Sequence, residues 1–395
     1  MRILVVSQYY YPEPFRIHEI CEELVRRDNV VTIVTSVPNY PEGEIYSGFE
    51  NEYGDTVING VRVLRCKCRP RKKGAKNLLL NYFSFYFNVK KVLKNLPCNY
   101  DIVYTYQLSP ITSSLPALDY AKKHNIPSVL YCLDIWPESV INYASATSLP
   151  FKMVKILSRS IYKKATILTV TSPSFIDYIS DLTKIPCDDI HWIPQHADDL
   201  GLIEKEETSD CINFVFLGNI GESQFIDGLM KTVSLVDKSL NFKIHIVGNG
   251  SAFEDVKTLC ESLQLQDKVV FHGRQPKEKM PEYYKMADVC IVSLRHEGVV
   301  GWTIPGKVQE YMSAGKAILG CIDGDTKVVI NEAKCGLCCE AEDVQAYAAN
   351  IVRMISDKDR LKEYGQNARK YYLDHFTLEK HVDELEKEFK TLVNK

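Results

Sequence analysis

Short apolar runs rich in valine and isoleucine recur along the chain and alternate with segments of helical pattern. In the first half they are Ile3–Val6, Val30–Thr35, Val61–Cys66, Ile102–Tyr106, Ser128–Cys132 and Ile167–Thr171. In the second half they are Asn213–Leu217, Lys243–Val247, Val269–His272, Val289–Leu294 and Ala317–Cys321. Apolar strands separated by helices are typical of βαβ units, whose strands pair in parallel. The pattern predicts an α/β fold with two doubly wound parallel sheets.

The length favours the same division, because 395 residues exceed the size at which a single core keeps growing. A strand closes near Ile193, and a polar run begins at Glu204. We therefore expect one Rossmann-like domain over residues 1–195, a second over residues 196–375, and a final helix over residues 376–395 that packs back on the first domain.

Composition excludes several classes of protein. With 45% hydrophobic residues, 25% charged residues and a net charge of -3, the chain resembles neither a disordered protein nor one that coats nucleic acid. The 13 cysteines are odd in number and several lie in apolar patterns, which indicates reduced thiols in the cytoplasm. None is spaced with partners as a zinc site requires, so we expect no metal. No leader or apolar run long enough to span a bilayer follows Met1.

The turn after the first strand, residues 8–16, is aromatic and contains no glycine. A dinucleotide fingerprint needs glycines there, so the turn argues against a nicotinamide-dependent dehydrogenase on this fold. Ligands of such sheets bind beyond the carboxyl ends of the strands, which makes Tyr11 and Arg16 candidates for contact with an acceptor. Packing of the loop by its own tyrosines is an equal alternative.

Strands in the second half end in glycine-bearing turns. Main-chain N–H groups in such a turn, at the start of a helix, favour a phosphate. We therefore predict a binding rim at these turns, and a helix that begins at about Ile226 after the first of them. The residues of the predicted rim are Gly218, Asn219, Gly221, Gln224, Gly248, Gly250 and Arg274.

A further strand ends at Leu294 and leads through a glycine-rich loop to a helix that Pro305 and Gly306 open. Lys307 would lie in the first turn of that helix, which is unfavourable for a cation unless an anion binds there. Glu310, one turn later, could accept hydrogen bonds from a pair of vicinal hydroxyls. The alternative is a solvated Lys and Glu on a helix surface.

These motifs resemble the retaining, family 4-like glycosyltransferases of the GT-B fold, whose donor domain has a glycine-rich loop before a helix carrying Glu. Residues 38–43, PNYPEG, and 133–139, LDIWPES, resemble the subgroup that transfers N-acetylated amino sugars such as N-acetylfucosamine in capsule, O-antigen or exopolysaccharide synthesis. The resemblance covers essentially the whole chain. It implies two domains facing a central cleft, a UDP-sugar donor, and neither cofactor nor metal.

By that resemblance, Glu310 would bind the ribose and Arg274 the base. The glycine turn from Gly218 and the loop that ends in Pro305 and Gly306 would bind the diphosphate and sugar. The first domain would bind the acceptor, with Asn39 and Tyr40 among its contacts.

Two departures from the family pattern are visible. Asn219 and Gln224 stand where the family usually has Arg and Lys, so another cation must compensate the leaving diphosphate. Lys307 is the first candidate for this catalytic role and Arg295 the second. The family's second Glu would fall at Trp302, and the nearest acid, Glu297, is the candidate on the sugar side.

Two acidic segments need separate interpretations. Asp134 follows the strand Ser128–Cys132 and could orient or deprotonate an acceptor hydroxyl, or else hold its loop through main-chain N–H groups. Asp323 and Asp325 flank Gly324 after a strand, which favours a turn over a metal-binding pair.

A basic stretch that contains Arg69, Arg71, Lys72 and Lys73 precedes the apolar segment Leu78–Phe87. Cations beside an apolar helix favour binding to an anionic membrane surface, and a solvated loop with a core helix is the alternative.

The sequence thus predicts an enzyme that moves a sugar from a UDP-sugar to a polyprenyl-diphosphate-linked saccharide, with peripheral attachment to the inner face of the cell membrane. The alternatives are an isomerase similar to the UDP-hexosamine 2-epimerases and a non-catalytic scaffold that binds nucleotide sugar.

Overall fold

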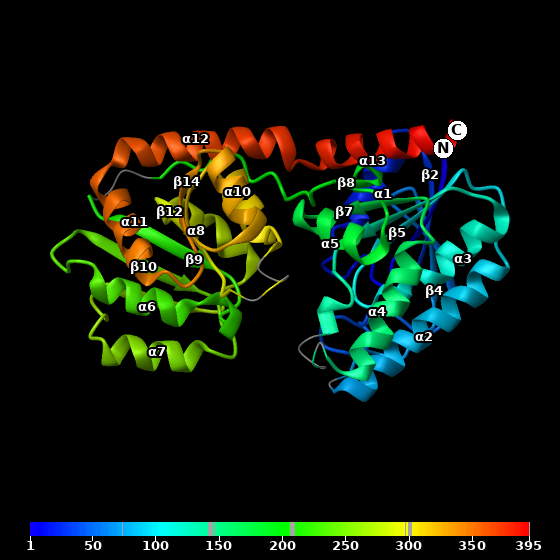
Figure 1. Ribbon diagram of the computed structural model, residues 1–395, viewed down its shortest axis with the longest axis horizontal. Helices are drawn as coiled ribbons and strands as arrows, with labels where there is room; N and C mark the ends of the chain where they lie inside the picture. The colour runs from blue at the N-terminus through cyan, green and yellow to red at the C-terminus, as the bar shows by residue number, and fades with distance from the viewer. Residues whose placement is uncertain are drawn as a thin grey trace. The chain divides into compact units, whose positions relative to one another are not determined.

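The computed structural model describes residues 1–72, 74–140, 145, 147–205, 210–296, 298 and 302–394. They form two compact units, and unit 1 contains residues 1–194 and 378–395, whereas unit 2 contains residues 195–377. Each unit is a predominantly parallel sheet covered by helices on both faces (Figure 1). This confirms the predicted fold class of two Rossmann-like domains.

The sheet of unit 1 has the strand order β3-β4-β2-β1-β5-β6-β7-β8. Its strands are β1 Arg2–Val6, β2 Val30–Ser36, β3 Gly54–Ile58, β4 Val61–Cys66, β5 Ile102–Gln107, β6 Ser128–Cys132, β7 Ile167–Val170 and β8 Ile190–Trp192. Its helices are α1 Ile17–Arg26, α2 Ala75–Lys94, α3 Leu115–His124, α4 Leu149–Tyr162, α5 Ser174–Thr183 and α13 Leu378–Val393. Most strands are apolar along their whole length because helices bury both faces of the sheet.

The edge strand β3 was not predicted, and it alone pairs antiparallel among the described strands. Its residues are mostly exposed, so it lacks the apolar run that marks the others. The last helix, α13, packs against α1 in unit 1 through the buried side chains of Val382, Leu385 and Phe389. A hydrogen bond of 2.7 Å from the Asn29 amide to the Glu386 carboxylate supports this contact.

The sheet of unit 2 has the order β11-β10-β9-β12-β13-β14. Its strands are β9 Ile212–Leu217, β10 Phe242–Val247, β11 Val269–Gly273, β12 Val289–Ser293, β13 Ala317–Cys321 and β14 Gly336–Cys339. Its helices are α6 Ile226–Leu235, α7 Phe253–Ser262, α8 Met280–Met286, α9 Gly306–Ser313, α10 Gly324–Glu332, α11 Val344–Ser356 and α12 Lys358–His375. The strand order reverses at β9, which lies between β10 and β12. Crevices at such a reversal are where open α/β sheets bind ligands.

Candidate active site

The turns after β9 and β10 pack backbone against backbone at the switch point of unit 2. Gly218 and Gly248 have φ values of 140° and 147°, which glycine adopts readily. A Cβ on Gly248 would lie 1.8 Å from the Gly218 carbonyl oxygen, and one on Gly250 would lie 2.3 Å from that of Ile220. Only glycine therefore lets the two turns close on each other.

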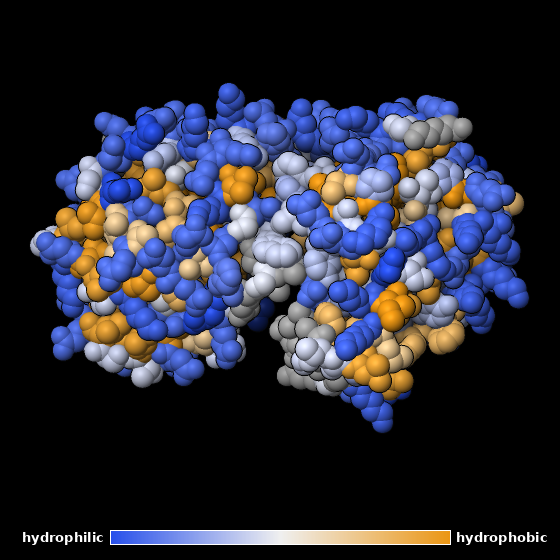
Figure 2. Space-filling model, viewed as in Figure 1, coloured by the Kyte–Doolittle hydropathy of each residue, from blue (hydrophilic) through white to orange (hydrophobic). Residues whose placement is uncertain are grey.

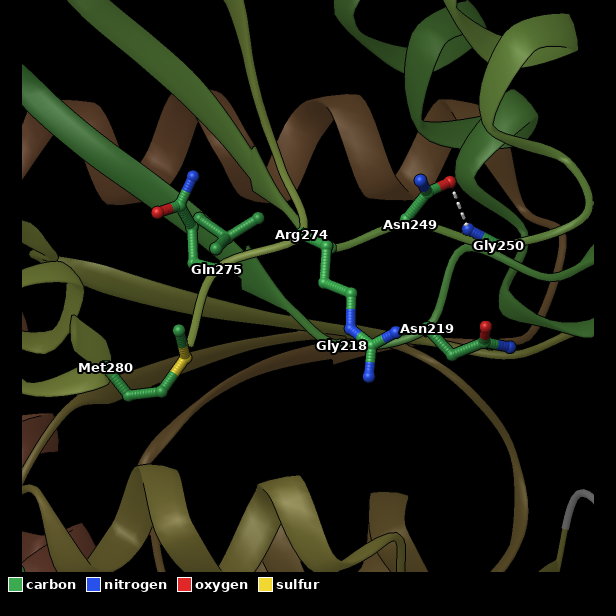
Figure 3. A pocket seen from close by; sticks show the side chains of 9 residues that line it. Gly218, Asn219, Asn249, Gly250, Arg274, Gln275 and Met280 are labelled. Atoms are coloured by element: carbon green, nitrogen blue, oxygen red, sulfur yellow. Dashed lines mark hydrogen bonds between the residues drawn. The ribbon is translucent and has the colours of Figure 1, made fainter. Parts of the chain in front are cut away.

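A pocket of about 550 Å³ opens at these turns (Figure 3). It is lined by Gly218, Asn219, Val247, Gly248, Asn249, Gly250, Arg274, Gln275 and Met280. The Arg274 side chain points into the pocket, as Figure 3 shows. The Asn249 carboxamide accepts a hydrogen bond of 2.7 Å from the Gly250 N–H group. The structure thus brings together the predicted residues of three separate turns.

Lys307 reaches the same turn from the first turn of α9. Its Nζ lies 3.1 Å from Oε1 of Gln224 and 4.2 Å from the centre of the Phe216 ring. It also lies 3.0 Å from the place a Cβ of Gly218 would occupy, so a side chain at 218 would press on the ammonium. Burial lowers the pKa of Lys307 to about 8, and the charge of Glu310 partly offsets that decrease. A largely buried cation held by neutral groups is suited to receive an anion.

Helix α9 begins where the sequence predicted. Pro305 has extended φ and ψ at its N-cap, and Gly315 has a φ of 68° just beyond its end. Glu310 lies one turn after Lys307, and its Oε2 accepts a hydrogen bond of 3.3 Å from the Tyr284 hydroxyl. Burial, followed by the negative charge of Glu310, raises the pKa of Tyr284, so the phenol remains protonated and donates to the carboxylate.

Arg295, the second candidate cation, forms ion pairs with two neighbouring carboxylates. Its guanidinium lies 2.5 Å from Oδ1 of Asp227 and 3.0 Å from Oε1 of Glu342, and its Nε donates to the Glu222 carbonyl at 2.9 Å. These bonds anchor the strand end to α6. Between the two candidates, the geometry therefore favours Lys307 as the cation that meets a ligand.

The aromatic turn of unit 1 is organised by Glu13, which the sequence analysis did not single out. Its Oε1 accepts hydrogen bonds from the N–H groups of Asn39 at 2.9 Å and Tyr40 at 2.8 Å, and its Oε2 from that of Tyr10 at 3.3 Å. Burial raises the pKa of Glu13 to about 7 despite these bonds and the nearby charge of Arg65. Its position between two prolines was the only available signal.

The expected acceptor residues differ in their exposure. Asn39 is fully buried, and its amide donates to the Val37 carbonyl and accepts from the Arg71 N–H, so it supports the loop. Tyr40 is half-buried, and its ring lies 5.2 Å from that of Tyr9 between ring centres. Tyr11 is exposed, and Arg16 lies 3.4 Å from Glu19 at the start of α1.

Asp134 holds its own loop. Its Oδ2 accepts a hydrogen bond of 2.7 Å from the Ser109 N–H group, and its main-chain oxygen accepts one from the Gln107 amide. The structure thus contains the main-chain contact by which Asp134 would hold its loop, whereas a catalytic role of Asp134 remains a prediction.

The acidic pair around Gly324 leads into α10. The Asp323 carboxylate accepts from the Ala341 N–H at 2.9 Å and lies 2.6 Å from the His296 ring. Among the described residues, no group of three or more His, Cys, Asp or Glu side chains could hold a metal ion together.

Within the basic stretch, Arg71 turns inward. Its guanidinium lies 3.5 Å from the Tyr9 hydroxyl and 5.3 Å from the centre of the Tyr40 ring. Arg69 and Lys72 are exposed. The predicted residues Lys73 and Glu297 lie outside the described part of the chain. No helix in that part is long and apolar enough to cross a membrane.

Four residues that line the pocket were not among the predicted site residues, namely Val247, Asn249, Gln275 and Met280. The first three are adjacent to predicted residues in the sequence, so adjacency could have identified them. Met280 comes from α8, and nothing in its local sequence indicates that this helix borders the pocket.

Comparison with known proteins is consistent with this geometry. The family described as Glycosyltransferase Family 4 matches residues 15–199, and the family described as Glycosyl transferases group 1 matches residues 203–371. An uncharacterized glycosyltransferase of Methanocaldococcus jannaschii is 23% identical over 412 residues, covering 100% of this chain and 99% of the relative. The N-acetyl-α-D-glucosaminyl L-malate synthase of Bacillus anthracis is 23% identical over 236 residues, covering 57% and 59% of the two chains.

Solved structures show the same fold at low identity. Sucrose-phosphate synthase of Thermosynechococcus elongatus superimposes with a TM-score of 0.76 at 16% identity, covering 99% of this chain and 98% of its own. The Anabaena protein HepE, solved in complex with UDP, superimposes with a TM-score of 0.70 at 13% identity, covering 99% of this chain and 100% of its own. The chain therefore belongs to the glycosyltransferases of the GT-B class, with a family 4 domain in its first half and a group 1 domain in its second.

Proposed function

We propose that the chain transfers a sugar, N-acetylated at an amino group, from a UDP-sugar to a polyprenyl-diphosphate-linked saccharide, with retention of configuration and without a metal. The solved relative HepE was crystallised with UDP and with UDP-glucose, and a Bacillus anthracis relative is named for an N-acetylglucosaminyl product. These names support a uridine nucleotide and an N-acetylated sugar. A Mycobacterium tuberculosis relative named for GDP-mannose matches 32% of this chain and makes GDP the competing nucleotide.

One observation carries the proposal: the Lys307 ammonium lies beneath the glycine turn with a neutral amide as its hydrogen-bond partner. Negative charge accumulates on the diphosphate as the sugar leaves, and a preorganised cation stabilises it. The first turn of α9 adds its N–H groups and dipole at the same place. Lys307 thus replaces the cations that Asn219 and Gln224 do not supply.

The proposal extends to the remaining predicted residues. Glu310 would hold the ribose hydroxyls, Arg274 would contact the base, and Asn219 would approach the diphosphate from the turn. Asp134 in unit 1 would orient the acceptor hydroxyl, and Glu297 would face the donor sugar. The exposed cations Arg69 and Lys72 would favour an anionic membrane surface, where a lipid-linked acceptor resides.

The test measures UDP release from a panel of UDP-sugars and GDP-mannose, with and without a lipid-linked acceptor, and identifies the product by mass spectrometry. The proposal expects release from a UDP-N-acetylamino sugar that depends on acceptor. Conversion of the donor without acceptor would indicate an isomerase, and binding without turnover would indicate a scaffold.

A further inference from the structure

Helix α4 carries apolar side chains on two faces. Phe151, Ile161 and Tyr162 are buried against unit 1. A separate stripe on the outer side consists of Leu149, Met153, Ile156 and Leu157, which are between 41% and 71% exposed. Their spacing repeats every three or four residues, so they lie on one side of the helix. A helix that only covered a sheet would present polar residues there.

Helix α2 carries a second exposed stripe. Leu79, Phe83 and Phe87 follow one another at intervals of one helical turn, and all three are exposed. Both helices contact the short helix Ile111–Ser113, which makes them neighbours in unit 1. Figure 2 shows apolar residues gathered at the lower end of unit 1, where Figure 1 shows α2 and α4.

The charged residues of these two helices all have one sign. Helix α4 contains Lys152, Lys155 and Arg159, and α2 contains Lys76, Lys90, Lys91 and Lys94. Neither helix contains an acidic residue, whereas the whole chain has a net charge of -3. Exposed apolar residues flanked by cations match a bilayer that offers hydrocarbon beneath anionic headgroups. A second copy of this chain would offer the same positive charge to these helices and be repelled.

We propose that the outer face of α4, together with the stripe on α2, inserts into the surface of an anionic lipid bilayer. This inference rests on the proposed function in one respect, because a lipid-linked acceptor explains why the chain would bind a bilayer. Binding to vesicles can be measured without that acceptor. It assigns insertion to a helix outside the basic stretch of residues 69–73.

The experiment measures sedimentation of the full chain with vesicles of phosphatidylglycerol and phosphatidylcholine in equal parts. Met153→Gln combined with Ile156→Gln should lower partitioning by about tenfold or more, because two apolar side chains no longer enter hydrocarbon. The control Val57→Gln changes a residue of β3 that is 70% exposed, close to the 71% of Ile156, and should bind as the original chain does.

A second measurement detects insertion directly. Ile156→Trp should gain fluorescence at shorter wavelength on vesicles and should be quenched by brominated acyl chains, whereas Val57→Trp should show neither change. Calorimetry with UDP checks each variant, because the altered residues lie in unit 1 and the nucleotide pocket lies in unit 2.

Two results would overturn the proposal, and a third bears on the proposed function alone. Unchanged partitioning of the α4 variant, with loss in Arg69→Ser combined with Lys72→Ser, would leave membrane binding to the basic stretch alone. A change from dimer to monomer in the α4 variant, with vesicle binding intact, would make the face a contact between copies. Failure of the original chain to bind UDP would contradict the proposed function while leaving the vesicle result in force.

Discussion

In each of the two units, a central strand is followed by a turn that leads into a helix. The two turns are nevertheless built around charges of opposite sign. In unit 1, the buried Glu13 accepts hydrogen bonds from three N–H groups, so the anion of that turn is internal. In unit 2, the cation Lys307 approaches the turn and donates to a neutral amide. The first turn already contains its anion, whereas the second is arranged to receive one.

The two pKa shifts express this difference. Burial raises the pKa of Glu13 to about 7 and lowers that of Lys307 to about 8, so in each case the fold disfavours the charged form. An external diphosphate would relieve the cost at Lys307. The comparison teaches that one architecture can hold a charge of either sign in its first turn, either satisfied internally or left beside neutral partners.

The largest expected effect is that of Gly248→Ala on the unit 2 turn. The added Cβ would overlap the Gly218 carbonyl at a positive φ, so the free energy of unfolding should fall by about 4 kcal/mol. UDP affinity should fall with it. The control Gly273→Ala has a φ of 66° and open space around its Cβ, and it should cost about 1 kcal/mol. Equal effects of the two changes would show that the close approach of the turns is unimportant.

The Glu13 turn should give a pH-dependent stability. The folded pKa of about 7 lies above the ordinary value of 4.5, so the folded state retains its proton over a range in which the unfolded chain ionises. The contribution of Glu13 to the free energy of unfolding is complete below about pH 4.5 and is lost as the pH rises through 7. The loss amounts to about 3 kcal/mol. Chemical denaturation at several pH values should show this decline, and Glu13→Gln should remove it. A decline that persists in the variant would assign it to other groups.

Glu310→Gln tests the ribose contact of unit 2. The amide keeps the shape of the carboxylate but loses a charge-assisted hydrogen bond, so UDP affinity should fall by about 1.5 to 3 kcal/mol. Calorimetry measures the change, and Glu13→Gln provides the matched control in the other turn. Unchanged UDP affinity would show that Glu310 does not contact the ribose.

The smallest expected effect is the alkaline limb of activity. If the Lys307 cation acts on the diphosphate, kcat/KM for the donor should decline about tenfold per pH unit above the free-enzyme pKa of about 8. The bound donor favours the charged form, so the corresponding limb of kcat should lie at higher pH. A flat profile of kcat/KM between pH 7 and 9.5 in the original chain would be inconsistent with this role.

The fold was predictable because strands buried on both faces leave continuous apolar runs, and those runs match the observed strands closely. The exposed β3 left no such signal, and neither did the short β14, which is rich in cysteine. Lys307 could be selected from sequence because a cation in the first turn of a helix is locally unfavourable. The pairing of Arg295 with Asp227 and Glu342 could not be predicted from sequence, since those partners come from distant segments.

The same limit applies to Glu13 and α4. Two of the three N–H groups that donate to Glu13, those of Asn39 and Tyr40, lie in another loop, and no local pattern indicates them. An apolar pattern on α4 predicts a helix without showing that one of its two apolar faces stays exposed. Sequence therefore predicts elements and charges well, whereas burial and pairing require the folded chain.

The most direct test of the account is the turnover of Lys307→Met, compared with that of Arg295→Met. Loss of one preorganised charge aimed at the leaving diphosphate should lower kcat by about a hundredfold or more, with a much smaller change in KM. Arg295→Met should reduce kcat less, because its guanidinium is bound to Asp227 and Glu342. Near-normal turnover of Lys307→Met together with inactivity of Arg295→Met would contradict the account and move the diphosphate to the end of β12.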